Sequence, residues 1–123
     1  MYKRQDIDEL CRKRAISHGL KVNFKQSNFE GEIVADIQSA RDAAAGIIIN
    51  GAGYTHTSIA ILDALKISEL PIIELHLSNI HAREAFRHHS YIAKAATGII
   101  CGFGAHGYVL AIDAMARLIE CAD

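Results

Sequence analysis

The sequence predicts an α/β fold, in which helices cover both faces of a parallel β-sheet. First, segments whose apolar residues recur at helical spacing alternate along the chain with short apolar runs. Second, runs such as Ile47-Ile48-Ile49 are continuously apolar, which is typical of strands covered on both faces. Third, half of the 123 residues are hydrophobic, enough for one buried core. We therefore expect residues 1–123 to form a single domain.

The first half of the chain predicts two helices with a short strand between them. A helix is expected over residues 6–18, with Asp6 as its cap and Gly19 as its end. Apolar and polar residues alternate over residues 22–24, which predicts a strand with one face in water. A second helix is expected over residues 31–41.

The second half of the chain predicts three strands and two helices. The strands are expected at residues 46–49, 72–76 and 98–101, because each is a short apolar run. The helices are expected over residues 57–67 and 108–120. Parallel α/β domains usually begin with a strand, whereas a helix comes first here. Either the domain starts on a helix, or a leading strand has been lost.

Composition argues against several classes of protein. Thirteen basic and fourteen acidic residues give a net charge of −1, and no basic stripe indicates nucleic-acid binding. No apolar stretch approaches the length of a membrane span. Cys11, Cys101 and Cys121 are widely spaced, which favours reduced packing residues over disulfides or a zinc site. We expect a cytoplasmic protein that binds neither nucleic acid nor a membrane.

Residues 74–90 are the most polar and titratable part of the sequence, and they directly follow an apolar run. They contain four of the seven histidines together with two arginines, two serines and an asparagine. Ligands of open parallel sheets bind beyond the carboxyl ends of the strands. Loops that leave a sheet also carry function more often than packing. This segment is the expected active site.

Glu74 and His76 are two residues apart on an expected strand, so their side chains point to the same face. A carboxylate beside an imidazole fixes its tautomer and favours its protonated form, which suits a general acid. The alternative is a polar ladder that faces water. Ser78, with the amides of Leu77 and Ser78, forms an expected cradle for a carboxylate or phosphate, although such a turn is often only a strand cap.

Four further residues are candidates for ligand binding. Asn50 ends the expected strand at 46–49. Arg87 offers a planar fork for an anion or hydroxyls, although it could equally be an exposed loop arginine. His56 and Asp63 are seven apart, which places them on one face of a helix. Asp63 lies among apolar residues and therefore needs a partner if it is buried.

Two cofactor hypotheses are poorly supported. His76, His81, His88 and His89 contain no His-x-x-x-His pair and no nearby cysteine, so a metal site is not expected. Residues 102–107 match Gly-x-Gly-x-x-Gly, but they follow the last expected strand. We interpret them as a tight strand-to-helix turn rather than a dinucleotide site.

Four sequence blocks together carry a family resemblance that runs from about residue 6 to the end of the chain. They are Gln26-Ser27-Asn28-x-Glu30-Gly31-Glu32, Ile48-Ile49-Asn50-x-x-x-Tyr54-Thr55-His56-Thr57-Ser58 followed by Asp63, Glu74-x-His76-Leu77-Ser78-Asn79-Ile80-His81-x-Arg83-Glu84-x-Phe86-Arg87-His88-His89-Ser90, and Gly102-x-Gly104-x-x-Gly107-Tyr108. With these blocks the chain resembles type II 3-dehydroquinate dehydratase. The third block is the most specific of the four.

The resemblance implies a flavodoxin-like fold and a cofactor-free enzyme that dehydrates 3-dehydroquinate to 3-dehydroshikimate through an enolate. It makes His76 the general acid and Glu74 the residue that orients it. It also implies homo-oligomers, trimers assembled into a homododecamer, with Asp63 near a subunit contact. The remaining residues would bind the substrate: Asn50, Leu77 and Ser78 its carboxylate, and His56, Asp63 and Arg87 its ring hydroxyls.

The chain departs from the family pattern in its first residues. The family begins with a strand and a loop that carry a tyrosine base, an arginine and an asparagine, and neither Tyr2 nor Arg4 aligns with them. Phe29 replaces a usual histidine, and Gly51-Ala52-Gly53 replaces a Pro-Gly-Ala-like turn. We therefore expect an N-terminally incomplete domain with impaired activity. The alternative is a non-catalytic flavodoxin-like module that binds a small polyhydroxy carboxylic acid.

A missing first strand has a structural consequence. In the flavodoxin-like order this strand lies between the strands expected at residues 22–24 and 46–49. Its absence predicts either a gap between them or their direct pairing. A gap leaves backbone groups without partners, so the chain would be poorly stable or would aggregate through exposed edges.

Overall fold

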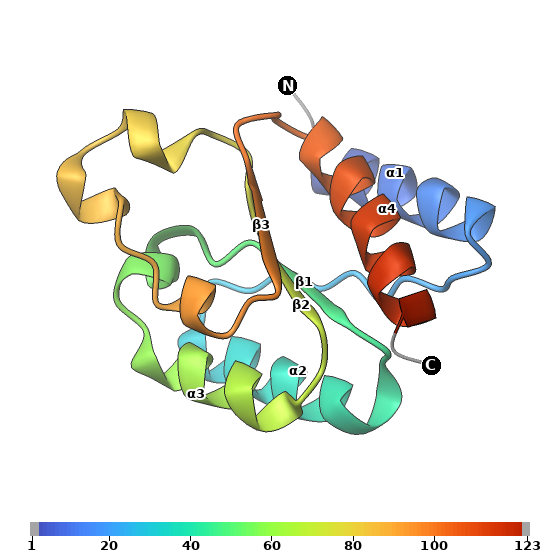
Figure 1. The fold of residues 1–123 in the computed structure, drawn as a ribbon, viewed down its shortest axis with the longest axis horizontal. Coiled ribbons are helices and arrows are strands. Elements are labelled where there is room, and N and C mark those ends of the chain that lie inside the picture. Colours follow the sequence, from blue (N-terminus) through green and yellow to red (C-terminus); the bar gives the residue numbers. More distant parts are fainter. Residues whose placement is uncertain (1–2, 122–123) are drawn as a thin grey trace.

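The computed structural model describes residues 3–121 and contains a parallel sheet with strand order β1-β2-β3 (Figure 1). Tyr2 lies outside the described residues. The strands are β1 (Ile47–Ile49), β2 (Ile72–His76) and β3 (Gly98–Cys101). The α-helices of the described part are α1 (Arg4–Ser17), α2 (Glu30–Ala43), α3 (Ile59–Ser68) and α4 (His106–Cys121).

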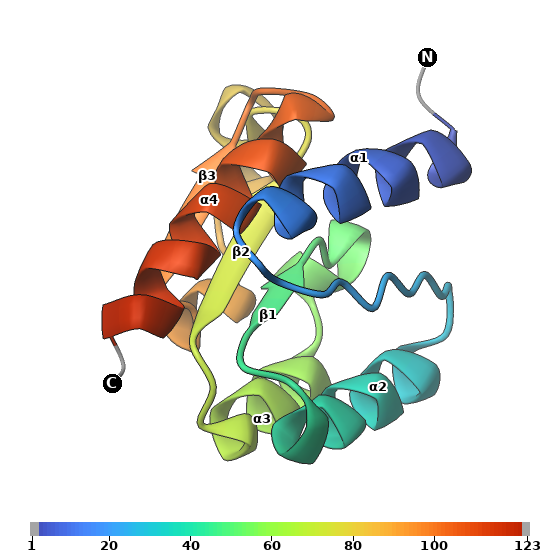
Figure 2. The same ribbon diagram turned by 90° about the vertical axis from the view of Figure 1, so that its right-hand side faces the viewer.

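The helices form one layer on each face of the sheet (Figures 1 and 2). On one face α2 and α3 pack together, and Ile37, Ile61 and Leu65 form a cluster with Ile72 of β2. On the other face α1 packs on α4, and Ala111 of α4 lies against the sheet. This arrangement confirms the predicted fold class, an α/β sheet with helices on both faces.

The parallel pairing places the carboxyl ends of all three strands at one edge. Ile49 pairs with Glu74, and His76 pairs with Cys101. The residues that follow the strands therefore meet at this edge, as expected from the sequence. They are Asn50 after β1, Leu77 and Ser78 after β2, and Gly102 after β3.

The strand predicted at residues 22–24 is wrong. Leu20, Val22 and Phe24 are half-buried and alternate with exposed residues, as predicted, but the segment belongs to no strand. It runs as an extended chain beside the sheet in Figure 2. Val22 packs against the same cluster as Ile48 of β1 without ladder pairing between the two segments. Alternation fixes an extended backbone, but a strand also needs a partner. Of the two expected arrangements, the structure has the unpaired one.

Each helix begins and ends within a few residues of its predicted position. Asp6 is not the cap of α1, because the helix begins at Arg4. The Asp6 side chain instead reaches back and accepts a hydrogen bond from the Lys3 backbone N–H at 3.0 Å, as a residue in the first turn does. In contrast, β2 and β3 have the predicted bounds.

The glycine-rich segment between β3 and α4 is a tight turn. Gly102 and Gly104 have φ of +98° and +59°, which residues with a side chain rarely adopt. A Cβ on Gly107 would lie 2.8 Å from Cδ1 of Leu75, so this glycine lets α4 approach the sheet closely. Within residues 3–121 no helix is long and apolar enough to cross a membrane.

The three cysteines are free thiols, but only Cys11 is a buried packing residue as predicted, because Cys101 is half-buried and Cys121 is exposed. Cys11 is buried between α1 and α4, and burial, with a smaller contribution from Asp8, raises the pKa of its thiol to about 11. A thiol with so high a pKa is protonated near neutral pH and behaves as a small apolar core residue.

Candidate active site

A buried carboxylate–imidazole pair lies at the carboxyl end of β2. Nε2 of His76 lies 2.5 Å from Oε2 of Glu74, and the side chains are on the same face of the strand. Glu74 is 0% and His76 4% exposed, which rules out the alternative of a polar ladder facing water. The carboxylate can only accept, so Nε2 carries the hydrogen of this bond. Nδ1 is then the ring nitrogen available to a ligand.

His56 lies beside this pair, in the connection between β1 and α3. It ends the short 3₁₀ helix Ala52–His56 and is half-buried. Its ring lies 6.4 Å from the His76 ring, centroid to centroid, and the two planes differ by 16°. Nδ1 of His56 donates to the backbone carbonyl of His89 at 2.8 Å, because a carbonyl oxygen only accepts. The structure thus brings together three predicted site residues.

Asn50 directly follows β1 and supports the turn that leads to His56. Its Oδ1 accepts a hydrogen bond from the Ala52 backbone N–H at 3.1 Å. Ala52 has a φ of +48°, an unusual backbone conformation for a residue with a Cβ. Burial raises the pKa of Tyr108 in α4, and the nearby Asn50 side chain lowers it to a smaller extent.

Leu77 and Ser78 follow β2 and have exposed side chains. The Leu77 carbonyl accepts a hydrogen bond from the Gly104 N–H at 2.9 Å, and the His76 carbonyl accepts one from the Gly102 N–H at 3.2 Å. These bonds tie the turn after β2 to the glycine turn after β3. The Ser78 side chain remains directed to solvent at the same edge as His76.

Arg87 is partly covered rather than a fully exposed loop arginine. Its side chain is 27% exposed, and Nε donates to Oε2 of Glu84 at 2.7 Å. The Glu84 backbone N–H, together with Arg87, lowers the pKa of the Glu84 carboxyl. The guanidinium also lies 5.2 Å from the ring centre of Phe86. In this structure Arg87 is therefore engaged within its own loop.

The prediction that His56 and Asp63 share one helical face is wrong. His56 ends the 3₁₀ helix, whereas Asp63 lies in α3, which begins at Ile59. The helices are separate because the Ser58 hydroxyl accepts from the Ile61 N–H at 3.0 Å and caps a new helix. Asp63 is exposed, so it does not need the partner that burial would have required.

Ser90 is a site residue that the sequence did not single out. Its hydroxyl donates to Oε2 of Glu74 at 2.9 Å, the same oxygen that binds His76. Ser90 belongs to the polar segment identified from the sequence, but it is sixteen residues from Glu74. No spacing rule connects residues at that separation, so only the folded chain reveals this contact.

The histidines do not converge on a metal site. His81 and His88 are neighbours, with ring centroids 5.8 Å apart, and His89 packs on Tyr91 instead. Among residues 3–121 no group of three or more His, Cys, Asp or Glu side chains is placed to hold a metal ion.

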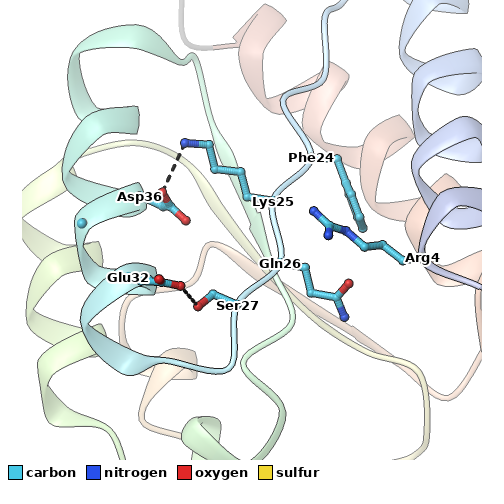
Figure 3. A pocket seen from close by; sticks show the side chains of 8 residues that line it. Arg4, Phe24, Lys25, Gln26, Ser27, Glu32 and Asp36 are labelled. Atoms are coloured by element: carbon cyan, nitrogen blue, oxygen red, sulfur yellow. Dashed lines mark hydrogen bonds and ion pairs between the residues drawn. The ribbon is translucent and has the colours of Figure 1, made fainter.

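A separate cavity of about 400 Å³ lies between the extended segment and α2 (Figure 3). Phe24 and Gln26 point to the side of Arg4 in this view, whereas Lys25 and Ser27 point to α2. Lys25 pairs with Asp36 at 3.2 Å, and Ser27 bonds to Glu32. This cavity contains no histidine, and two of its charged groups, Lys25 and Asp36, pair with each other. The candidate active site therefore remains the edge around His76.

Comparison with known proteins gives one consistent result. The family model "Dehydroquinase class II" matches residues 2–116. The 3-dehydroquinate dehydratase of Methylobacterium radiotolerans is 55% identical over 113 residues, which are 92% of this chain and 76% of that protein. The 3-dehydroquinate dehydratase 2 of Pseudomonas putida is 50% identical over 115 residues, which are 94% of this chain and 77% of that protein.

Two crystal structures are similar in both sequence and fold. The type II dehydroquinase of Propionibacterium acnes has a TM-score of 0.87 and 39% identity, covering 92% of this chain and 83% of that one. The type II dehydroquinase of Butyrivibrio crossotus has a TM-score of 0.89 and 39% identity, covering 93% and 80%. The chain belongs to the class II dehydroquinase family.

Proposed function

We propose that this chain acts as a 3-dehydroquinate dehydratase, a hydro-lyase that converts 3-dehydroquinate to 3-dehydroshikimate. Family membership and the names of the relatives support this assignment. The observation that carries it is the buried Glu74–His76 pair at the carboxyl end of β2. A histidine held in this way is suited to protonate a leaving group at the sheet edge where α/β domains bind their ligands.

In the proposed mechanism His76 is the general acid. Its Nδ1 gives a proton to the departing hydroxyl of the enolate intermediate, and the C–O bonding electrons leave with the oxygen as water. The enolate electrons form the carbon–carbon double bond of the enone. His76 is then neutral and keeps the Nε2 hydrogen that Glu74 holds. The family resemblance implies that a tyrosine abstracts the first proton. Residues 3–121 would supply the general acid of the later step, the loss of water.

The substrate carboxylate would bind Asn50 and the Leu77-Ser78 turn, which meet at the same sheet edge. His56 would bind a ring hydroxyl, because its Nδ1 is occupied by His89 and Nε2 is available next to His76. Arg87 would bind a second hydroxyl after release from Glu84. The role of Asp63 rests on the family resemblance alone.

We also propose a cytoplasmic homo-oligomer built from trimers, up to a dodecamer. The exposed face of α3 supports a subunit contact near Asp63. Ile59 and Ile67 are 57% and 59% exposed, and they lie four residues before and after Asp63 on the same helix face. Two exposed isoleucines around a carboxylate form a surface that a second subunit would cover. Light scattering that shows only monomer would contradict this proposal.

The test of the function is an absorbance assay. The product has a conjugated enone that the substrate lacks, so turnover of dehydroquinate appears as a rise in ultraviolet absorbance. In a chain carrying the N-terminal strand and loop that the family resemblance implies, we expect turnover that falls steeply in His76→Ala. Calorimetry that detects dehydroquinate binding without any turnover would favour the alternative, a non-catalytic module for a small polyhydroxy carboxylic acid.

A further inference from the structure

Residues 89–91, the last two of the polar segment and the residue after it, contact three parts of the candidate site. The His89 carbonyl accepts from Nδ1 of His56 at 2.8 Å. The Ser90 hydroxyl donates to Oε2 of Glu74 at 2.9 Å. The Tyr91 N–H donates to the carbonyl of Thr55, next to His56, at 2.9 Å. This short segment therefore connects the strand end that carries His76 with the turn that carries His56.

We propose that Ser90 is a positioning residue for the general acid and acts through the Glu74 carboxylate. Ser90 does not need to touch the substrate for this role. Its effect on the reaction rests on the proposed function, whereas its effect on the Glu74–His76 pair does not. None of the sequence patterns assigns Ser90 a role, and the proposal stands on its contacts in the folded chain.

The contacts of Glu74 show why a positioning residue is needed. Oε2 accepts from both His76 and Ser90, whereas Oε1 is buried and has no hydrogen-bond partner among the described residues. A carboxylate with a single donor could turn about its last bond and exchange the two oxygens. A second donor on Oε2 opposes this rotation, because turning would break two bonds in a site without water access.

Ser90 is itself held in one orientation. Its Oγ accepts a hydrogen bond from the Ala93 N–H at 3.0 Å, at the start of the short 3₁₀ helix Ile92–Lys94. Ile92 of this helix is 0% exposed and belongs to the core cluster under α3. With the bond from Ala93 accepted, the hydroxyl hydrogen is donated to Glu74. The core packing of this helix thus positions Ser90, Ser90 holds Glu74, and Glu74 orients His76.

The first test compares Ser90→Ala with Ser90→Thr, which keeps the hydroxyl. The matched control is Ser68→Ala, because the Ser68 hydroxyl also donates to an oxygen (Leu65 carbonyl, 2.6 Å) and accepts from a backbone N–H (Leu70, 3.3 Å). The readout is the exchange-protected, far-downfield proton resonance of His76 Nε2–H, assigned by its loss in His76→Gln. We expect it to be lost in Ser90→Ala and kept in the other two variants.

The second test uses turnover. Ser90→Ala should lower kcat roughly tenfold to a hundredfold with little change in KM, because a small displacement of an acid costs rate more than binding. In a Glu74→Gln background the same change should cost less than about twofold, because the residue through which Ser90 acts is already altered. Ser90→Thr should restore most of kcat.

Each outcome bears on the proposal. If a chain carrying the N-terminal strand and loop that the family resemblance implies does not turn over dehydroquinate, the proposed function fails, and the His76 resonance alone decides the role of Ser90. A resonance that survives in Ser90→Ala would overturn the proposal. An equal loss of kcat in the Glu74→Gln background would also overturn it. An equal effect of Ser68→Ala would show general destabilisation instead of positioning.

Discussion

The Glu74 carboxylate and the His76 imidazole are joined by a 2.5 Å hydrogen bond, and both side chains are buried at the carboxyl end of β2. Water therefore does not screen the interaction between these two side chains. Interactions between charged groups are stronger in a buried site than at the surface. The predictions below test this pair, its surroundings and the scaffold that holds it.

The Leu77-Ser78 turn is predicted to bind the substrate carboxylate. Ser78→Ala should raise KM roughly tenfold to a hundredfold, since a hydrogen bond to a charged group contributes roughly 1.5–3 kcal/mol. Stability should not change, because the side chain is exposed. Steady-state kinetics and thermal unfolding measure the two effects. Crystals soaked with sulfate or citrate should also show density at these amides and at Asn50, and an empty turn with the anion bound elsewhere would count against the idea.

Replacement of Ala52 by glycine is predicted to stabilise the turn that follows Asn50. Ala52 has a φ of +48°, where a Cβ is unfavourable by roughly 1–2 kcal/mol. Glycine removes this strain but adds freedom to the unfolded chain, so we expect a net gain of up to about 1 kcal/mol in the free energy of unfolding.

The control for Ala52→Gly is Ala60→Gly, at an exposed position inside α3. Glycine should destabilise that helix by about 1 kcal/mol. Urea denaturation of both variants measures the difference. A loss of stability in Ala52→Gly equal to that in Ala60→Gly would mean that the backbone at Ala52 is not strained.

Asp113 of α4 is predicted to make stability depend on acid pH. Its carboxylate bonds to Arg14 at 2.6 and 2.9 Å and to His18 at 2.7 Å. Arg14 first, and then His18, lower the pKa of Asp113 from 3.8 to about 2. A carboxyl whose pKa is lowered in the folded state stabilises the protein at pH values above its ordinary pKa of 3.8. This contribution is lost as the pH falls through about 2.

Asp113→Asn should therefore be less stable than the unaltered chain at neutral pH, and the difference should shrink between about pH 4 and pH 2. Thermal unfolding at a series of pH values measures it. The difference should also shrink at high salt, because these groups are partly exposed. A difference that is constant across this range would show that the ion pairs do not link α1 to α4 energetically.

The extended segment beside β1 is predicted to open easily. β2 lies between two partner strands and is buried along its whole length, so its amides should exchange most slowly. Residues 21–28 belong to no ladder, and their amides should exchange among the fastest. Hydrogen exchange with mass spectrometry separates the two. Protection of residues 22–24 equal to that of β2 would show that this segment pairs in solution.

The low stability expected from an unpaired segment stays a prediction. Backbone groups on β1 and on the extended segment lack ladder partners, which favours association through the open edge. Denaturant unfolding combined with light scattering tests this. An ordinary cooperative transition of a monodisperse protein, with residues 22–24 still unpaired, would show that the consequence of the gap is smaller than expected.

Local sequence patterns predicted the elements whose structure is decided locally. The apolar runs gave the bounds of β2 and β3, and the period of two placed Glu74 and His76 on one face. The pairing of residues 22–24 could not be predicted in this way, because a ladder depends on where distant segments lie. The contact between Ser90 and Glu74 depends in the same way on tertiary packing.

A local sequence pattern could have prevented the wrong prediction for His56 and Asp63. Ser58 followed by an apolar run is a helix-start pattern, and it indicated that α3 begins after His56. The seven-residue spacing was therefore applied across a helix boundary. Asn50 and Arg87 were correctly placed in the connections after β1 and β2. The contact of Asn50 with the Ala52 N–H was not predicted. The Arg87–Glu84 pair was not predicted either, although its three-residue spacing was a local signal.

The account depends most directly on His76 as the general acid. The decisive measurement is steady-state turnover of 3-dehydroquinate, followed through enone absorbance, by a chain carrying the N-terminal strand and loop that the family resemblance implies and by its His76→Ala variant. The control is His18→Ala, which removes a partly exposed histidine from the contact with Asp113. We predict that His76→Ala lowers kcat by roughly two to four powers of ten with little change in KM, and that His18→Ala leaves both unchanged. A kcat of His76→Ala equal to that of its parent chain would contradict the account.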